Sequence, residues 1–241
     1  MSFLVVNSQA RVIAPPRADV WIARTMKSRP FMHTTGRLER VGVPGIPETG
    51  APNVIYVAHV RVPKAGTYYL LARPRGPVKI GGIQSLVVKG HSNSPEVGEQ
   101  APTSRTPTLR SAHGNLARLT TRVPPDRALL RYSVADSLTG HVPFVVTFAT
   151  PRWCQSRLCG PVVDVVDYVR RRFSGTPVRF IHVEVYKRNN PRNGWNQWMR
   201  QWHLPTEPWT FLVGRDGRIK AKFEAAVSAR ELESAVNRYL R

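Results

Sequence analysis

The feature that most constrains the fold of this chain is an apolar run that passes quickly into a helical pattern. Residues 144–148 read FVVTF, and an uninterrupted run of this kind is typical of a strand buried on both faces of a sheet. Over residues 161–172, valines then recur at the spacing of one helix face, which predicts a helix. A buried strand that leads into a helix indicates an α/β fold for this half of the chain.

The same half continues with alternating strand and helix patterns up to the C-terminus. The turn 214–217 carries the Asp-Gly signature of a hairpin, and Ser228 with Glu231 forms a capping box before the last helix. We therefore predict the order strand, helix, strand, helix, strand, strand, helix. The later elements of this order are expected at 178–186, 195–202, 209–213, 219–223 and from residue 228 onward.

The only two cysteines, Cys154 and Cys159, lie between the first predicted strand and the first predicted helix. Two cysteines in one short segment argue against a disulfide scaffold and indicate a local chemical role. Pro161 suits the first helical position because it has no N–H to leave unpaired, so Cys159 and Gly160 fall at the helix N-terminus or just before it. The free N–H groups and the dipole at that end stabilise a thiolate.

Two arginines, Arg152 and Arg157, lie on either side of Cys154 and add positive charge that further favours a thiolate. A thiol with a low pKa is the species that attacks disulfides or peroxides, and the second thiol could then resolve the intermediate. On an ideal helix, residues five apart point away from each other. A disulfide between Cys154 and Cys159 therefore requires a loop or an unwound first turn.

Three segments of this half together resemble the thioredoxin superfamily. They are FVVTFATPRWCQSRLCGPVVDVVDYV at 144–169, PTEPWTFLVGRDGRI at 205–219, and the capped terminal helix. The resemblance implies a thioredoxin-like domain over residues 126–241 that exchanges disulfides with protein thiols, protein disulfides or another redox partner. The long form of the first two segments also resembles a family of uncharacterised actinobacterial, often exported, thioredoxin-like proteins. Those proteins resemble this chain in its N-terminal part as well.

The resemblance also implies which residues meet a substrate. Pro208 occupies the place of the family's cis-proline, and Glu207 before it would face the cysteines and the substrate backbone. Trp153 and Trp209 would lie on the same surface. A carboxylate at Glu207 would raise the pKa of a nearby thiol, which opposes the effect of the helix. Ala225 stands where thioredoxins commonly have a glycine near this surface.

The Cys-x4-Cys spacing departs from the Cys-x-x-Cys of thioredoxins and leaves two registers open. Counted from the strand, Cys154 takes the place of the nucleophile; counted from the Cys-Gly-Pro triplet, Cys159 does. The peroxiredoxin Q group shares the Cys-x4-Cys spacing, which keeps a thiol peroxidase open. Thr150 is, however, one residue further from Cys154 than that group's threonine is. A structural disulfide in a non-enzymatic interaction module is the remaining alternative.

Neither a cofactor nor a metal is expected for this chain. Zinc bound by the cysteines together with His182 and His203 is the metal site that we considered, but the spacing matches no usual zinc pattern. His182 and Glu184 lie on one face of the strand predicted at 178–186. They are either two satisfied polar groups at a strand end or proton-handling groups beside the thiols.

The first 90 residues read as short strands without a helical period. Residues 53–62 alternate in hydropathy, a Pro-Lys-Ala-Gly turn follows, and residues 67–72 are rich in aromatic and aliphatic side chains. This spacing of strands predicts an all-β immunoglobulin-like sandwich over residues 1–90. Residues 91–125 are rich in Ser, Thr and Pro, so we expect a linker or an extended lead-in there.

The chain is strongly basic, with 36 Lys and Arg against 15 Asp and Glu and a formal net charge of +21. This excess is spread along the whole chain and shows no basic patch with interleaved aromatic residues, so no nucleic-acid partner is expected. Because no run of about 18 apolar residues occurs, no spanning helix is expected either. The opening MSFLVV is not a signal peptide. That predicts the cytoplasm if the start is as given, and the cell envelope if an export signal precedes it.

Overall fold

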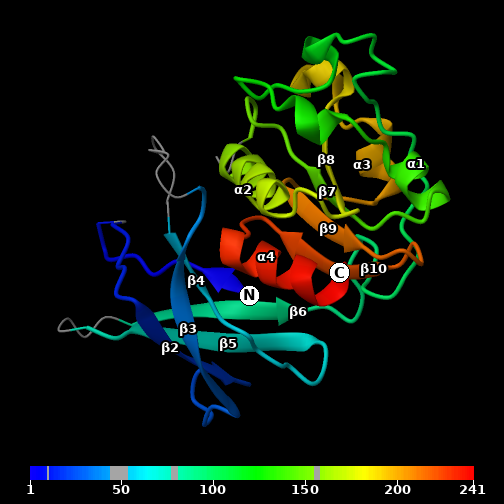
Figure 1. Ribbon diagram of the computed structural model, residues 1–241. Helices are drawn as coiled ribbons and strands as arrows, with labels where there is room; N and C mark the ends of the chain where they lie inside the picture. Colours follow the sequence, from blue (N-terminus) through cyan, green and yellow to red (C-terminus); the bar gives the residue numbers. More distant parts are fainter. Residues whose placement is uncertain (10, 44–53, 77–80, 155–157) are drawn as a thin grey trace. The chain divides into compact units, whose positions relative to one another are not determined.

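The computed structural model describes residues 1–9, 11–43, 54–76, 81–154 and 158–241 (Figure 1). The chain divides into two compact units. The first is formed by Met1–Val41 and Pro52–Ser92, and the second contains Asn93–Arg241. None of the helices in the described ranges is both long and apolar enough to span a lipid bilayer.

The first unit is one antiparallel sheet of six strands in the order β1-β4-β3-β2-β5-β6. Along β2, buried residues alternate with half-buried ones, so one face of the strand packs into the core of this unit. Tyr56 contributes to that core, and its hydroxyl donates a hydrogen bond of 2.7 Å to the carbonyl of Pro15. The strands are β1 (Ser2–Phe3), β2 (Arg17–Ala23), β3 (Met32–Arg40), β4 (Val54–Val57), β5 (Gly66–Pro74) and β6 (Gly82–Val88).

The prediction of an all-β unit is confirmed, but a two-sheet sandwich is not observed. All six strands that the structure describes in this unit join the same sheet. The difference has a physical reason. Alternating hydropathy reports only that one face of a strand is buried, and it does not say whether a second sheet covers that face.

The second unit contains a mixed sheet of four strands in the order β10-β9-β7-β8. β7 (Phe144–Phe148) is parallel to β8 (Arg179–Val183) and antiparallel to β9 (Trp209–Val213), which is in turn antiparallel to β10 (Ile219–Glu224). Helix α2 (Cys159–Arg172) connects the parallel pair, α3 (Gln197–Gln201) precedes β9, and α4 (Ala229–Tyr239) follows β10. The predicted order of strands and helices is therefore confirmed, and it is the arrangement that the thioredoxin resemblance implies.

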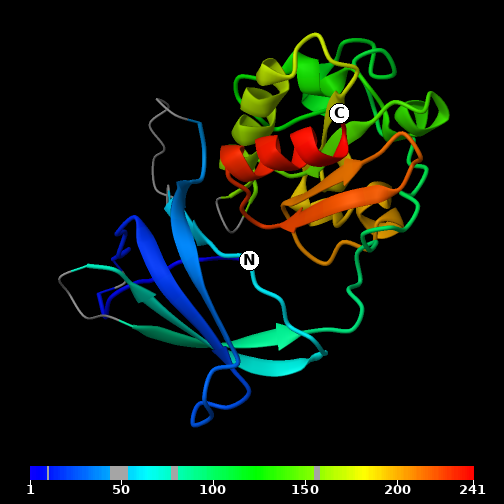
Figure 2. The same cartoon turned by 60° about the horizontal axis from the view of Figure 1, so that its bottom comes forward.

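Apolar layers cover both faces of this sheet. On one face, α2 and α4 pack together and against the sheet, and Figures 1 and 2 both show these two helices side by side. On the other face, Trp202 and Met199 from the region of α3 pack with Phe148 and with Val134 of the short helix α1 (Val134–Thr139). Burial on both sides explains why the sequence of β7 is apolar without alternation.

The segment expected to be a linker or lead-in packs within the second unit from Asn93 onward. Ala101 donates its N–H to the carbonyl of Gly217 at 2.9 Å, beside the β9–β10 turn. Ser104 is fully buried; it accepts a hydrogen bond from Nε1 of Trp202 at 3.1 Å and donates one to Gln201 at 2.7 Å. Single hydroxyl groups hold this extended segment in place, so its apolar residues do not recur at a regular spacing. Hydrophobic periodicity therefore does not reveal that the segment is packed.

A candidate dithiol site

The site begins at the first turn of α2, where the N-cap residue itself provides no side-chain hydrogen bond. The residue before the helix is Leu158, which has no polar atom to accept the free N–H groups of the first turn. Cys159 is the first helical residue and Pro161 the third, so the helix starts two residues earlier than the sequence predicted. The unpaired donors of this turn are therefore open to another acceptor.

That acceptor is the sulfur of Cys154. The N–H of Cys159 donates a hydrogen bond of 3.2 Å to Sγ of Cys154. Both cysteines are free thiols; Cys159 is completely buried, whereas Cys154 is half-buried. Because Cys154 lies outside the helix, the geometric conflict expected for two residues five apart on a helix does not arise. Arg157, expected to add charge here, lies outside the described residues.

Glu207 is the third ionisable group at this place. One oxygen of its carboxylate and the two sulfur atoms all lie within 4.8 Å of one another. Glu207 is half-buried and is joined by a cis peptide bond to Pro208, which is buried directly before β9. Burial, together with the negative charge of Cys154, raises the pKa of Glu207 to about 7. Glu207 therefore exchanges protons in the neutral range.

Burial changes the prediction for Cys159. The sequence indicated a thiolate at the helix N-terminus, but desolvation raises the pKa of Cys159 far above its usual value. The hydrogen bond and the charge of Cys154 raise it further, while a backbone hydrogen bond at Thr150 acts in the opposite direction. The cost of removing a Cys159 thiolate from water outweighs its stabilisation by the helix N-terminus, because the Cys159 side chain has no contact with water.

A hydrogen-bonded chain holds the segment before Cys154 in place. The N–H of Arg152 donates to Oγ1 of Thr121 at 3.2 Å, and that hydroxyl donates to Oε1 of Glu184 at 2.6 Å. Glu184 is buried, and so is His182, whose Nε2 lies 3.0 Å from the carbonyl oxygen of Ala149. Both residues that the strand pattern singled out thus support the cysteine segment. Sequence reasoning missed Thr121, because nothing local marks it.

The two tryptophans expected at the substrate surface differ in exposure. Trp153 is 39% exposed, and its Nε1 donates a hydrogen bond of 2.9 Å to the carbonyl of Asn189. The guanidinium of Arg152 lies 4.9 Å from the centre of the Trp153 ring. Trp209 is only 5% exposed and stacks on Phe211, so most of its ring belongs to the core. Trp153 is therefore the tryptophan that solvent or a substrate can reach.

A cavity of about 630 Å³ lies against the cysteine segment. Pro151 and Arg152, which precede Cys154, line it together with Gly160, which follows Cys159. Among the described residues, no atom other than those of its chain neighbours and its own helix lies within 4 Å of the position that a Cβ on Gly160 would occupy. The far side of the cavity is held by Arg122, whose Nη2 lies 2.6 Å from Oδ1 of Asp164 in α2.

The same three groups are the ones that could hold a metal ion. Among the described residues, Cys154, Cys159 and Glu207 form the cluster with suitable ligand atoms, and no histidine joins it. His182 is bonded to the backbone of the preceding strand end, and His203 is exposed after α3. The set considered from the sequence, which paired the cysteines with His182 and His203, is therefore not brought together.

No protein-family model and no curated protein sequence matches this chain. Among solved structures, the chain is similar to a thiol:disulfide interchange protein of the thioredoxin family from Chlorobium tepidum TLS. The two share 12% sequence identity with a TM-score of 0.41, over 61% of this chain and 100% of the other. The strand order and helix positions of the second unit, rather than this likeness, indicate its thioredoxin-like fold.

Proposed function

We propose that the second unit is a thiol–disulfide oxidoreductase of the thioredoxin-like class, and that its substrates are protein thiols and disulfides. The observation that carries this proposal is the hydrogen bond from the N–H of Cys159 to Sγ of Cys154 at the start of α2. A helix N-terminus stabilises an anionic acceptor, and a thiolate is the nucleophile in disulfide exchange.

Cys154 is the nucleophile in this proposal, and Cys159 is the resolving thiol. Cys154 is half-buried and follows the exposed residues Arg152 and Trp153, so a substrate disulfide can approach it. Cys159 has no exposed surface, and its raised pKa keeps it protonated until the mixed disulfide has formed. The first register of the motif, counted from the end of β7, is therefore the one that we favour.

The exchange proceeds in two steps, and in each step one S–S bond forms while another breaks. The Cys154 thiolate attacks one sulfur of a substrate disulfide, which forms a mixed disulfide and releases a substrate thiolate that takes up a proton. Cys159 then loses its proton and attacks the sulfur of Cys154, which forms the Cys154–Cys159 disulfide and releases the second substrate thiol. The substrate disulfide gains two electrons, and the pair of cysteines loses them.

Glu207 is the group that we propose to accept the proton of Cys159 in the second step. Its carboxylate lies within 4.8 Å of the Cys159 sulfur, and its pKa of about 7 allows it to take up and release a proton near neutral pH. Substrate backbone would lie along Glu207 and Pro208 and over Trp153. The cavity bordered by Gly160 would take a neighbouring part of the same substrate.

The first experiment is a titration of the reduced protein by thiolate absorbance, together with the Cys154–Cys159 reduction potential in glutathione buffers. A first thiol pKa below about 7 that is lost in Cys154→Ser, with a potential between about −270 and −120 mV, supports exchange chemistry. A first pKa near 8.5 with a potential below about −300 mV contradicts it and indicates a structural disulfide in an interaction module. Rapid consumption of hydrogen peroxide would assign the dithiol to a peroxidase instead.

A further inference from the structure

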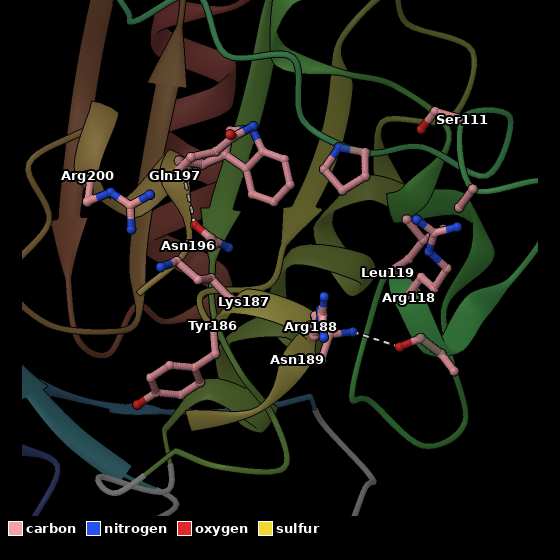
Figure 3. Close-up of a pocket in the computed structure, with 14 residues that line it drawn as sticks. Ser111, Arg118, Leu119, Tyr186, Lys187, Arg188, Asn189, Asn196, Gln197 and Arg200 are labelled. Atoms are coloured by element: carbon pink, nitrogen blue, oxygen red, sulfur yellow. Dashed lines mark hydrogen bonds between the residues drawn. The ribbon is translucent and has the colours of Figure 1, made fainter. Parts of the chain in front are cut away.

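A second cavity of the same unit has a volume of about 730 Å³ (Figure 3), and its lining includes Asn189, whose carbonyl accepts the hydrogen bond of Trp153. Its lining comes from four places in the chain: residues 107–112, the region of the 3-10 turn Leu116–Arg118, the region of the 3-10 turn Lys187–Asn189, and the start of α3. A volume of this size is typical of a site for a small organic molecule. Nothing in the dithiol chemistry uses it.

Among the described residues that line this cavity, every charged side chain is a cation. These side chains are Arg118, Lys187, Arg188 and Arg200. Arg200 is held through Nη1, which donates to the carbonyl of Trp195 at 2.6 Å. The side chains of the other three make no hydrogen bond and no ion pair with any residue that the structure describes. Several unpaired cations around one hollow favour an anionic occupant.

The backbone that carries these cations is held in an uncommon conformation. Arg188 and Asn189 have φ angles of 53° and 54°, in the left-handed region that residues other than glycine seldom adopt. Asn189 secures the turn, because its Nδ2 donates to the carbonyl of Ala117 at 2.8 Å and its carbonyl accepts from Trp153. Strain of this kind persists where surrounding contacts fix it, and it gathers at binding sites. The cations are therefore presented by a preorganised turn.

Aromatic residues also line the cavity. The ring of Tyr186 stacks on Trp195, with ring centres 4.9 Å apart and an angle of 3° between the planes, and it points away from Arg118 and Arg188 (Figure 3). Trp198 also lines the cavity, and its indole N–H is buried without an acceptor among the described residues. Asn196 fixes the position of Trp198 by accepting its backbone N–H at 3.1 Å. An aromatic side chain in the lining of a cavity binds a planar apolar group more tightly than it binds a hydrated inorganic ion.

We propose that this cavity binds a small organic anion, in which a phosphate or carboxylate group is attached to a flat apolar body. The anionic group contacts Arg188 with Lys187 or Arg118, and the flat body lies against Trp198. The proposal does not rest on the redox activity proposed for Cys154 and Cys159, although Asn189 in the cavity lining accepts the hydrogen bond of Trp153.

The test is titration calorimetry of the full chain with phenyl phosphate and with benzoate, using inorganic phosphate and phenol as reference probes. At least one aromatic anion should bind saturably and about tenfold more tightly than either reference. Arg188→Gln should weaken that binding about tenfold, because it removes a charge-assisted contact and keeps the length of the side chain. The matched control is Arg215→Gln, which removes one charge from an exposed position in the β9–β10 turn and should leave the affinity unchanged.

The indole N–H resonance of Trp198, assigned by its loss in Trp198→Phe, should shift on titration with the aromatic anion that binds. Lys187→Gln gives a second variant in case Arg188→Gln does not fold. Equal affinities in wild type, Arg188→Gln and Lys187→Gln would overturn the proposal. So would the absence of saturable binding of both aromatic anions up to about 10 mM. Of phenyl phosphate and benzoate, the tighter ligand identifies the anionic group.

Discussion

The N–H of Cys159 donates a 3.2 Å hydrogen bond to Sγ of Cys154, so the first cysteine caps the helix that the second one begins. This contact joins the two residues through backbone and sulfur rather than through a disulfide. The two cysteines also differ in their part of this bond, because the half-buried Cys154 accepts it and the buried Cys159 donates it. The predictions below follow from this pair and from the residues that hold it.

Alkylation should distinguish the two thiols. In Cys159→Ser the remaining Cys154 should react with iodoacetamide at least about tenfold faster at pH 7 than Cys159 does in Cys154→Ser, because burial and a raised pKa protect Cys159. Mass spectrometry of timed samples measures both rates, and denatured protein provides the unprotected reference. Equal rates in the two folded variants would contradict the assignment of Cys154 as the nucleophile.

Glu207→Gln should change how stability depends on pH. The pKa of Glu207 is raised from 4.5 to about 7 in the folded chain, so the fold retains a proton that the unfolded chain has already released. The free energy of unfolding therefore falls as the pH rises from about 4.5 to about 7. Glutamine does not ionise, so Glu207→Gln should lack this part of the decline. Urea unfolding between pH 4 and pH 8 under reducing conditions measures it.

A constant difference between wild type and Glu207→Gln across that pH range would contradict the assignment. The Cys154→Ser variant serves as a control, because the charge of Cys154 is the second cause of the raised pKa. In that variant the free energy of unfolding should fall less between pH 4.5 and pH 7 than in wild type. Part of the fall should remain, since burial is the larger cause of the raised pKa of Glu207.

Thr121→Val should destabilise the second unit by about 1–3 kcal/mol, because it leaves the N–H of Arg152 without its acceptor and removes one donor from buried Glu184. Thr121→Ser is the matched control, since it keeps the hydroxyl group and should retain most of the stability. Urea denaturation followed by tryptophan fluorescence measures both variants. If Thr121→Val were as stable as Thr121→Ser, the hydroxyl would not hold the cysteine segment.

Ala225→Gly should raise the free energy of unfolding by up to about 1 kcal/mol. Ala225 has a φ of 60°, and its N–H donates to the carbonyl of Pro208 at 2.9 Å. Glycine adopts this left-handed conformation without the steric cost that alanine has, which exceeds the loss of chain entropy. The control is Ala221→Gly in the extended strand β10, which should destabilise. A decrease in stability for both variants would contradict this account.

Periodic and local sequence patterns were sufficient to predict helices and strands of the second unit. The run of apolar residues in β7, the valine spacing of α2 and the capping box at Ser228 each predicted an element that the structure contains. The preference of proline for the first helical position predicts a start of α2 at Pro161, two residues later than the observed start at Cys159. The left-handed position of Ala225 also agrees with the expectation that a glycine commonly stands there.

The parts that the sequence did not predict depend on contacts between distant residues. The hydrogen bonds from Thr121 to Glu184 and from Trp153 to Asn189 join segments that no periodicity connects. The high pKa of Cys159 results from the packing around it, whereas the sequence shows only that it lies at a helix end. In the first unit, strand patterns fixed which side chains are buried but not how many sheets the strands form.

The two ends of α2 are stabilised by different kinds of group. Three arginines occupy the last turn, whereas the first turn, preceded by Leu158, has a sulfur atom as its acceptor. Ionisation at that sulfur and formation of the first helical turn are therefore parts of one thermodynamic cycle, in which each favours the other to the same extent. A sulfur bound in a disulfide is a weaker acceptor than a thiolate, so oxidation should loosen the turn. The exchange rate of the Cys159 amide proton thus reports the chemical state of its neighbour.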